Sequence, residues 1–184
     1  MLLFPVVLTA QTGNVSNPPQ AQPAPPSQTQ SQPATQAAPN AVQQNAQQQE
    51  ATNSDQFRAD VEEGVKHMLV SQIEAWNHQK LEGFMQGYWR SPDLTFFSGA
   101  SVTKGWEPTL QRYRQRYQSQ GKEMGQLEFQ DLNIDVVGRK AAVVTGSWLL
   151  TMSDGSKPHG LFTLIVKRMP GGWKIVHDHT SAAE

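Results

Sequence analysis

The sequence contains no cysteine. Disulfide bonds, thiol catalysis and zinc sites built on thiolates are therefore excluded. Basic residues are not in excess either, because the formal net charge is −1. Binding to nucleic-acid phosphates needs a clear excess of Lys and Arg, so we expect no nucleic-acid partner. The apolar run at residues 1–10 is much shorter than the roughly 20 residues of a membrane-spanning helix, so no transmembrane segment is predicted.

Residues 1–53 also have little of what a folded core requires. They contain one charged residue, Glu50, one aromatic residue, Phe4, and eight of the twelve prolines. Such a segment buries too little apolar surface to offset the entropy lost on ordering. We therefore expect a disordered linker rich in Gln, Pro and Ala at residues 11–53.

Residues 1–10 are mostly apolar and end on a small residue, Ala10. This pattern is typical of the end of a secretory signal peptide, although the basic first region is missing. It predicts a truncated signal peptide and a secreted or periplasmic location. The alternative is an untargeted terminus without structure of its own.

The remaining residues, 54–184, hold all five tryptophans and all three tyrosines. Between Asp55 and Trp76 apolar residues recur every three or four positions, which predicts an amphipathic helix with Ser54 or Asp55 as its N-cap. The apolar spacing predicts two further helices, at residues 81–89 and 106–117.

Strand-like segments fill most of the rest. A short strand at residues 94–98 and a return strand to residue 104 precede the third helix. After it come four longer strands, separated by turns at Gly138-Arg139, Asp154-Gly155 and Gly171-Gly172. The parity of the apolar positions changes near Gln130 and Asp131, which predicts a β-bulge there. Helices followed by an antiparallel meander indicate an α+β fold, with a curved antiparallel sheet wrapped around about three N-terminal helices into a cone.

The last strand ends in ionisable residues. Side chains alternate along a strand, so Trp173, Ile175, His177 and His179 are expected to share one face. That face would run from the packed core to the mouth of a cavity. Asp178 is expected on the opposite face, toward solvent or a partner subunit.

Several short motifs resemble a known family. Ala75-Trp76-Asn77, Gly105-Trp106, Gly146-Ser147-Trp148 and the closing segment 172–181 look like the SnoaL-like family of unknown function. That family belongs to the superfamily of nuclear transport factor 2 and ketosteroid isomerase, and the likeness covers about residues 57–182. The closing segment is also similar to the association domain of calcium/calmodulin-dependent protein kinase, which assembles into rings.

The resemblance implies chemistry without a cofactor, such as isomerisation, cyclisation or dehydration, and no cofactor is predicted. The superfamily holds enzymes, binding modules and assembly domains on one scaffold, so the fold cannot choose among them. Ketosteroid isomerase uses an Asp base with a Tyr and a protonated Asp. The first predicted helix has no tyrosine, so this triad is not carried over.

Three histidines are the catalytic candidates. His179 or His177, with His159 assisting from the neighbouring strand, could act as general acid or base because imidazole titrates near neutral pH. The alternative is that these histidines are structural. They could also ligate zinc or iron, but no Glu or Cys reinforces such a site, and no metal is predicted.

Four large aromatic residues are the ligand-binding candidates: Trp106, Tyr113, Trp148 and Phe162. Their alternative role is ordinary core packing. The predicted function is an exported domain that binds a small apolar or aromatic organic molecule and forms a homodimer through its sheet. Two alternatives stay open: a cofactor-independent isomerase, cyclase or dehydratase using a pocket histidine, and a homo-oligomerisation module without ligand.

Overall fold

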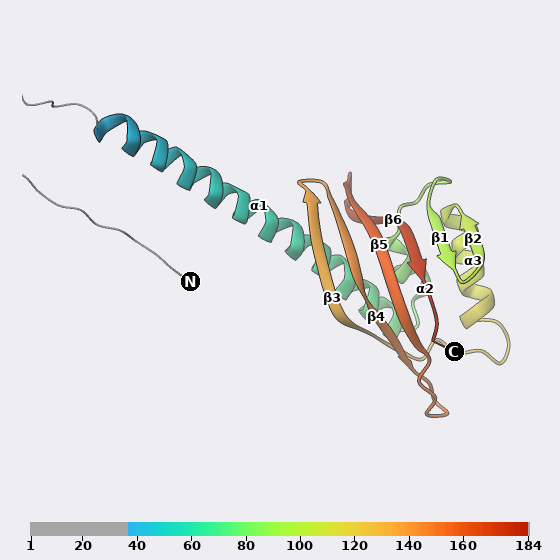
Figure 1. The fold of residues 1–184 in the computed structure, drawn as a ribbon. Coiled ribbons are helices and arrows are strands. Elements are labelled where there is room, and N and C mark those ends of the chain that lie inside the picture. Colours follow the sequence, from blue (N-terminus) through green and yellow to red (C-terminus); the bar gives the residue numbers. More distant parts are fainter. Residues whose placement is uncertain (1–36, 184) are drawn as a thin grey trace, which may run out of the picture.

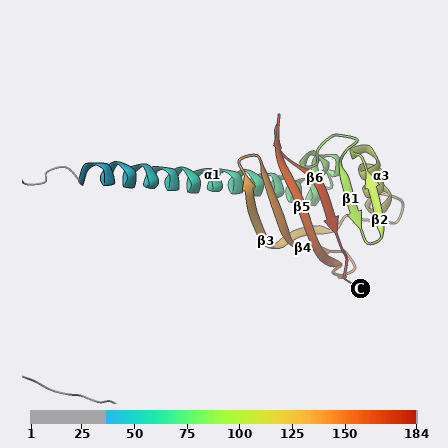
Figure 2. The same cartoon turned by 45° about the horizontal axis from the view of Figure 1, so that its top comes forward.

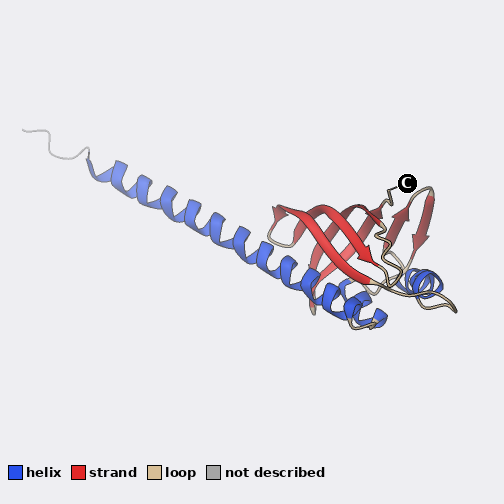
Figure 3. Ribbon diagram, turned by 90° about the horizontal axis from the view of Figure 1, so that it is seen from below, coloured by secondary structure: helices blue, strands red, loops and turns tan. Residues whose placement is uncertain are grey.

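The computed structural model describes residues 37–183. The predicted signal segment and residues 11–36 of the predicted linker lie outside this range. The elements in chain order are the helices α1 (Ala37–Asn77) and α2 (Leu81–Phe84), the 3-10 turn η1 (Met85–Gly87), the strands β1 (Thr95–Ser98) and β2 (Ser101–Lys104), the helix α3 (Trp106–Tyr117), and the strands β3 (Gln126–Gly138), β4 (Ala141–Thr151), β5 (His159–Met169) and β6 (Gly172–Thr180). The helices lie on one side of the sheet, so the predicted α+β fold is confirmed (Figures 1 and 3).

Helix α1 begins at Ala37, well before the predicted start at Asp55. Its first part runs away from the sheet, and nearly all side chains of residues 40–60 are exposed (Figure 2). Residues 37–53, the last part of the predicted linker, are helical and exposed, and Ala and Gln, which dominate there, are good helix formers even without a buried face. Burial begins at Val61 and continues at Val65 and Leu69, which face the sheet. The chain division at residue 53 stays a prediction. None of the described helices is long and apolar enough to span a membrane.

The sheet has six strands in the order β2-β1-β6-β5-β4-β3. The four long strands β3 to β6 form the predicted antiparallel meander. The expectation of a purely antiparallel sheet is wrong at one place, because β1 pairs with β6 in parallel, with Thr95 opposite His177. The β1–β2 hairpin joins the sheet beside β6, the last strand, and not beside the next long strand in sequence, β3.

The bulge predicted near Gln130 and Asp131 is confirmed. The register of β3 against β4 shifts between Gln130 and Asn133. Asp131 has φ 53°, in the left-handed region that Asp tolerates better than most residues. The bulge restores the apolar parity of β3 and bends the strand over the helices.

A second bulge, in β6, was not predicted. Ile165 lies opposite His177 and the next residue of β5, Val166, lies opposite Ile175, so Val176 is an extra residue in β6. The side chains beyond the bulge therefore change faces relative to those before it. Trp173 and Ile175 are buried, as is Asp178. The prediction that His177 and His179 share the inner face with Trp173 is wrong for this reason.

Candidate ligand cavity

A cavity of about 530 Å³ lies between the helices and the concave face of the sheet. Its volume is within the range of small-molecule sites, roughly 300–1,000 Å³. Aromatic residues are the largest group in its wall: Trp76, Phe84, Tyr88, Phe96, Tyr113, Tyr117, Phe129, Trp148 and Phe162. Aliphatic residues fill in between them: Leu127, Leu150, Leu164, Ile175 and Ala182. The polar lining residues are Gln72, Ser98, Arg112, Gln115, Arg116, Asp178 and Thr180.

Contacts between neighbouring rings position the aromatic part of this wall. Trp76 of α1 meets Phe84 and Tyr117 edge to face, with ring centroids 4.9 and 4.8 Å apart. Its indole N–H donates to the carbonyl of Met124 at 3.0 Å, which fixes the ring between helix and sheet. Edge-to-face pairs of this kind contribute about 0.5–1.5 kcal/mol each beyond the area they bury, so they stabilise this arrangement of rings.

Asp178 is the only acidic residue in the lining of this cavity, and it is 3% exposed. Its carboxylate accepts two hydrogen bonds, from the Tyr88 hydroxyl to Oδ2 at 2.7 Å and from the Thr180 hydroxyl to Oδ1 at 2.6 Å. Burial raises the pKa of Asp178 to about 6, against the two hydrogen bonds, which lower it. Near neutral pH this carboxyl can therefore gain or lose a proton, which an ordinary surface Asp does not do.

Two tyrosines extend the polar cluster. The hydroxyl oxygens of Tyr88 and Tyr113 are 3.3 Å apart. When Asp178 is ionised, the Tyr88 hydroxyl donates its proton to the carboxylate. The Tyr113 hydroxyl is then the donor, and the Tyr88 oxygen the acceptor, in the hydrogen bond between the two tyrosines. Burial, and then the charge of Asp178, raise the pKa of both hydroxyls well above their ordinary value, so both stay protonated donors. The result is a chain of hydrogen bonds from Tyr113 through Tyr88 to the carboxylate.

Gln72 of α1 supplies an acceptor without a partner among the described residues. Its side-chain N–H donates to the carbonyl of Phe84 at 3.0 Å. Its amide oxygen is buried and has no hydrogen-bond partner. A buried acceptor left unpaired is costly, so a donor from a bound molecule or water would stabilise this side chain.

The three predicted histidines do not line this cavity. His177 lies on the outer face of the sheet, where its Nδ1 is 2.6 Å from the Thr95 hydroxyl. His179 is exposed on the same face, and the ring of Phe97 packs edge to face against both histidines. His159 is exposed near the β4–β5 turn. Burial, and then the neighbouring His179, lower the pKa of His177.

The histidines also do not form a metal site. Within residues 37–183, no three His, Asp or Glu side chains lie close enough together to hold one ion. The outer face thus has two histidines, and the carboxylate of Asp178 points the other way.

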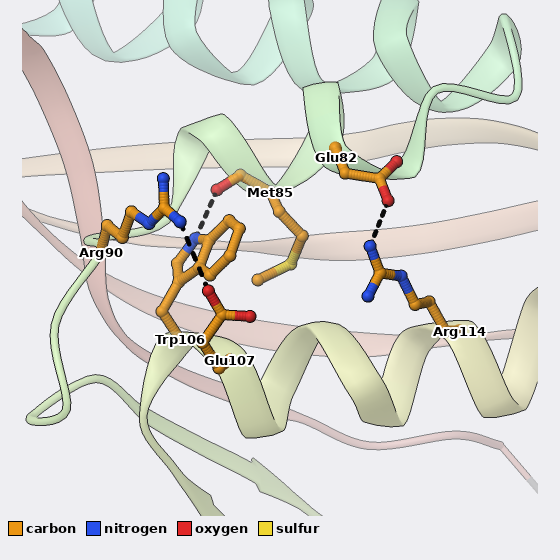
Figure 4. Close-up of polar contacts among 6 residues, drawn as sticks. All are labelled: Glu82, Met85, Arg90, Trp106, Glu107 and Arg114. Atoms are coloured by element: carbon orange, nitrogen blue, oxygen red, sulfur yellow. Dashed lines mark hydrogen bonds and ion pairs between the residues drawn. The ribbon is translucent and has the colours of Figure 1, made fainter.

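Three of the four predicted aromatic residues, Tyr113, Trp148 and Phe162, do line the cavity. Trp106 lies outside its lining. Its indole N–H donates to the carbonyl of Met85 at 3.0 Å, and the Arg90 guanidinium lies over its ring (Figure 4). Trp106 therefore anchors α3 to η1. Whether the other three bind a ligand stays a prediction.

The sequence reasoning missed Asp178, Tyr88 and Gln72 as site residues. Gln72 lies in helix α1 and Tyr88 lies just after η1, in the segment predicted as the second helix; both have many apolar neighbours in sequence, and neither gave a signal of its own. The alternation of Asp178 with the two histidines predicted that they lie on opposite faces, which is correct. The bulge at Val176 exchanges the two faces, so Asp178 and not the histidines faces the cavity.

The chain belongs to the family of SnoaL-like domains, since that family matches residues 65–184. The resemblance drawn from the motifs is thereby confirmed. No curated protein matches this chain.

Solved structures agree with this family. An NTF2-like protein of unknown function from Shewanella oneidensis MR-1 is 34% identical, with a TM-score of 0.60, over 65% of this chain and 97% of that one. An NTF2-like protein of unknown function from Pseudomonas putida KT2440 is 18% identical, with a TM-score of 0.57, over 68% of this chain and 88% of that one. An NTF2-like superfamily protein from Salmonella enterica serovar Typhimurium LT2 is 19% identical, with a TM-score of 0.52, over 71% and 94%. The last two show the fold alone.

Proposed function

We propose that this domain binds a small, largely apolar organic molecule in the cavity between the sheet and α1 and α3. The observation that carries the proposal is an open cavity of about 530 Å³ with aromatic walls and one buried carboxyl, Asp178. Convergent polar groups on apolar walls are what ligand sites have in common. An assembly module without ligand has no need of such a cavity and could fill it with side chains.

The polar groups define how a ligand would be oriented. The Asp178 carboxyl accepts a hydrogen bond when ionised and donates one when protonated, and Gln72 offers a buried acceptor. A ligand with a hydroxyl group on an aromatic or alicyclic body can donate to the ionised carboxylate or to the Gln72 oxygen and keeps its apolar surface against the rings, whereas a carbonyl oxygen can only accept from the protonated carboxyl.

A neutral aromatic amide, naphthamide, tests the proposal. Binding is measured by the change in intrinsic fluorescence or by calorimetry on the full chain. Ala182 and Ala183 provide matched variants, because both are exposed after β6 but only Ala182 lines the cavity. We expect Ala182→Trp to change naphthamide affinity about tenfold and Ala183→Trp to leave it unchanged. Equal effects of the two variants on naphthamide affinity would contradict the proposal, as would failure of both naphthamide and its carboxylate analogue, naphthoate, to bind folded protein at millimolar concentration.

A second candidate function is cofactor-independent acid–base catalysis, such as isomerisation, cyclisation or dehydration. It is favoured by the pKa of about 6 at Asp178 and by the hydroxyl chain from Tyr113 through Tyr88. A general acid or base works best with a pKa near the operating pH. In this version Asp178 takes the role that the sequence assigned to a pocket histidine, because His177, His179 and His159 lie outside the cavity lining.

Assembly and location are further parts of the proposal. The outer face of the sheet exposes Leu161 by 64% and Ile165 by 38%, and such a patch supports a homodimer formed through that face. Export to the periplasm or medium rests on the apolar residues 1–10 alone. Mass analysis of the N-terminus of the secreted protein tests it, and recovery of residues 1–10 on intracellular protein only would contradict it.

A further inference from the structure

Helix α3 carries three arginines that point in two directions. Arg112 and Arg116 are four residues apart, so they share one face of the helix, and both line the cavity. Arg114 lies between them in sequence and points elsewhere, since its guanidinium donates to Glu82 at 2.6 Å (Figure 4). The helix thus places two of its three positive charges at the cavity.

Neither of these two arginines has a carboxylate partner among residues 37–183. The ion pairs in that range are Lys66 with Glu62, Arg90 with Glu107, and Arg114 with Glu82. On the same helix Arg114 does have a carboxylate partner, so among the arginines of α3 only the two that line the cavity lack one.

Aromatic rings hold both unpaired guanidinium groups in place. The Arg112 guanidinium carbon is 5.5 Å from the centre of the Phe96 ring, and that of Arg116 is 5.9 Å from the centre of the Tyr117 ring. A guanidinium over a ring face is held by the cation–π attraction and keeps N–H groups for an anion. Arg112 is half-buried and Arg116 is exposed, so the pair marks the passage from the cavity to solvent.

The carboxyl inside the cavity does not neutralise this pair. Asp178 is engaged by Tyr88 and Thr180 and forms no ion pair with either arginine. The two positive charges therefore remain for an external anion, and a planar guanidinium can bind a planar carboxylate through two parallel hydrogen bonds.

We propose that the ligand of this cavity is an organic carboxylate with an aromatic or alicyclic body, its carboxylate held by Arg112 and Arg116 and its body among the rings. The inference rests on the proposed small-molecule binding and names the class of molecule bound.

Naphthoate and naphthamide form a matched pair of probes, since they share one apolar body and differ in charge. We expect the full chain to bind naphthoate about tenfold more tightly than naphthamide, the value of a partly exposed charge-assisted contact. Arg112→Gln should remove most of this preference. Arg116→Gln should reduce it by a smaller factor because that side chain is exposed. Arg114→Gln is the control on the same helix and should leave the preference at the wild-type value.

The outcomes separate the two proposals. Equal affinity for the two probes, or equal loss of preference in Arg114→Gln and Arg112→Gln, overturns the carboxylate inference while ligand binding stands. Failure of both probes to bind folded protein overturns both. Thermal unfolding of each variant shows whether it is folded, and raised salt should weaken naphthoate binding but not naphthamide binding.

Discussion

The two faces of β6 differ in chemistry although they alternate along the same few residues. The inner face presents Asp178, buried and bonded to Tyr88 and Thr180. The outer face presents His177 and His179, one half-buried and one exposed, beside Phe97. A single extra residue, Val176, decides which set faces the cavity.

This contrast shows that a titratable residue has to be placed before its chemistry is assigned. Imidazole has the more suitable pKa in free solution, but the two histidines lie on the outer face, away from the cavity. The carboxyl of Asp178 has an unsuitable pKa in free solution, and burial raises it to about 6. The environment, and not the residue type, gives the inner face the group that titrates near neutral pH.

The largest expected effect follows from Asp178→Asn. The pKa of Asp178 is raised in the folded state, so its contribution to stability is present below the unfolded pKa of about 4 and is lost as pH rises through about 6. A shift of about two units corresponds to about 3 kcal/mol. Asn keeps a neutral group of the same shape, and the Tyr88 and Thr180 hydroxyls can still bond to it.

We therefore expect the wild-type free energy of unfolding to fall by about 3 kcal/mol relative to Asp178→Asn between about pH 3 and about pH 8. Urea unfolding of both proteins across this range measures it. Parallel pH profiles for the two proteins would show that Asp178 titrates as an ordinary surface carboxyl.

A smaller effect is expected from Tyr88→Phe, which removes a donor from the buried carboxylate. The loss should cost about 1–3 kcal/mol at pH 8, where Asp178 is ionised, and less at pH 5, where it is mostly protonated. Tyr117→Phe is a matched control, since the Tyr117 hydroxyl forms no hydrogen bond to Asp178. If Tyr88→Phe and Tyr117→Phe lose the same stability at both pH values, the hydroxyl does not support the carboxylate.

On the outer face, Leu161→Lys should break assembly with little cost to the folded subunit. Leu161 is 64% exposed, so the substitution is expected to change the free energy of unfolding of the subunit by about 0.5 kcal/mol or less. Light scattering at micromolar concentration should give a dimer mass for the wild type and a monomer mass for the variant. A monomer mass for the wild type itself would contradict the proposed homodimer.

The smallest effect is expected for His179→Ala. The side chain is exposed and outside the cavity lining, so unfolding should change by less than about 0.5 kcal/mol and naphthamide affinity should stay at the wild-type value. His177→Ala should cost about 1 kcal/mol, because it removes the contact with Thr95. Weaker binding of naphthamide by His179→Ala would contradict this prediction and indicate that His179 contributes to ligand binding.

Most of the fold could be predicted from local patterns. The apolar spacing of residues 106–117 and the glycine turns between the long strands have direct causes in side-chain alternation and turn geometry, and the structure confirms them. The predicted start of α1 was wrong. Composition indicates whether a segment can pack against a core, but it does not indicate whether Ala and Gln can extend an existing helix.

The site could be predicted only in part. Tyr113, Trp148 and Phe162 line the cavity as large aromatic residues facing the concave side. Asp178 was assigned to the wrong face because a bulge leaves no mark in a sequence such as Val176-His177-Asp178, where both parities give an acceptable strand. The link from Tyr88 to Asp178 joins residues 90 positions apart, which no local pattern contains.

The parallel pairing of β1 with β6 sets the order in which the domain can form. Thr95 and His177 are 82 residues apart in sequence, so this pairing closes a long loop and pays its entropy before it gains contacts. The hairpins of the meander close much shorter loops and are expected to form first. The strand that carries Asp178, β6, belongs to the meander through its pairing with β5, so the carboxyl is expected to be in place before β1 adds Phe96 and Ser98 to the cavity wall. Hydrogen exchange during refolding should show protection of β3 to β5 before that of β1.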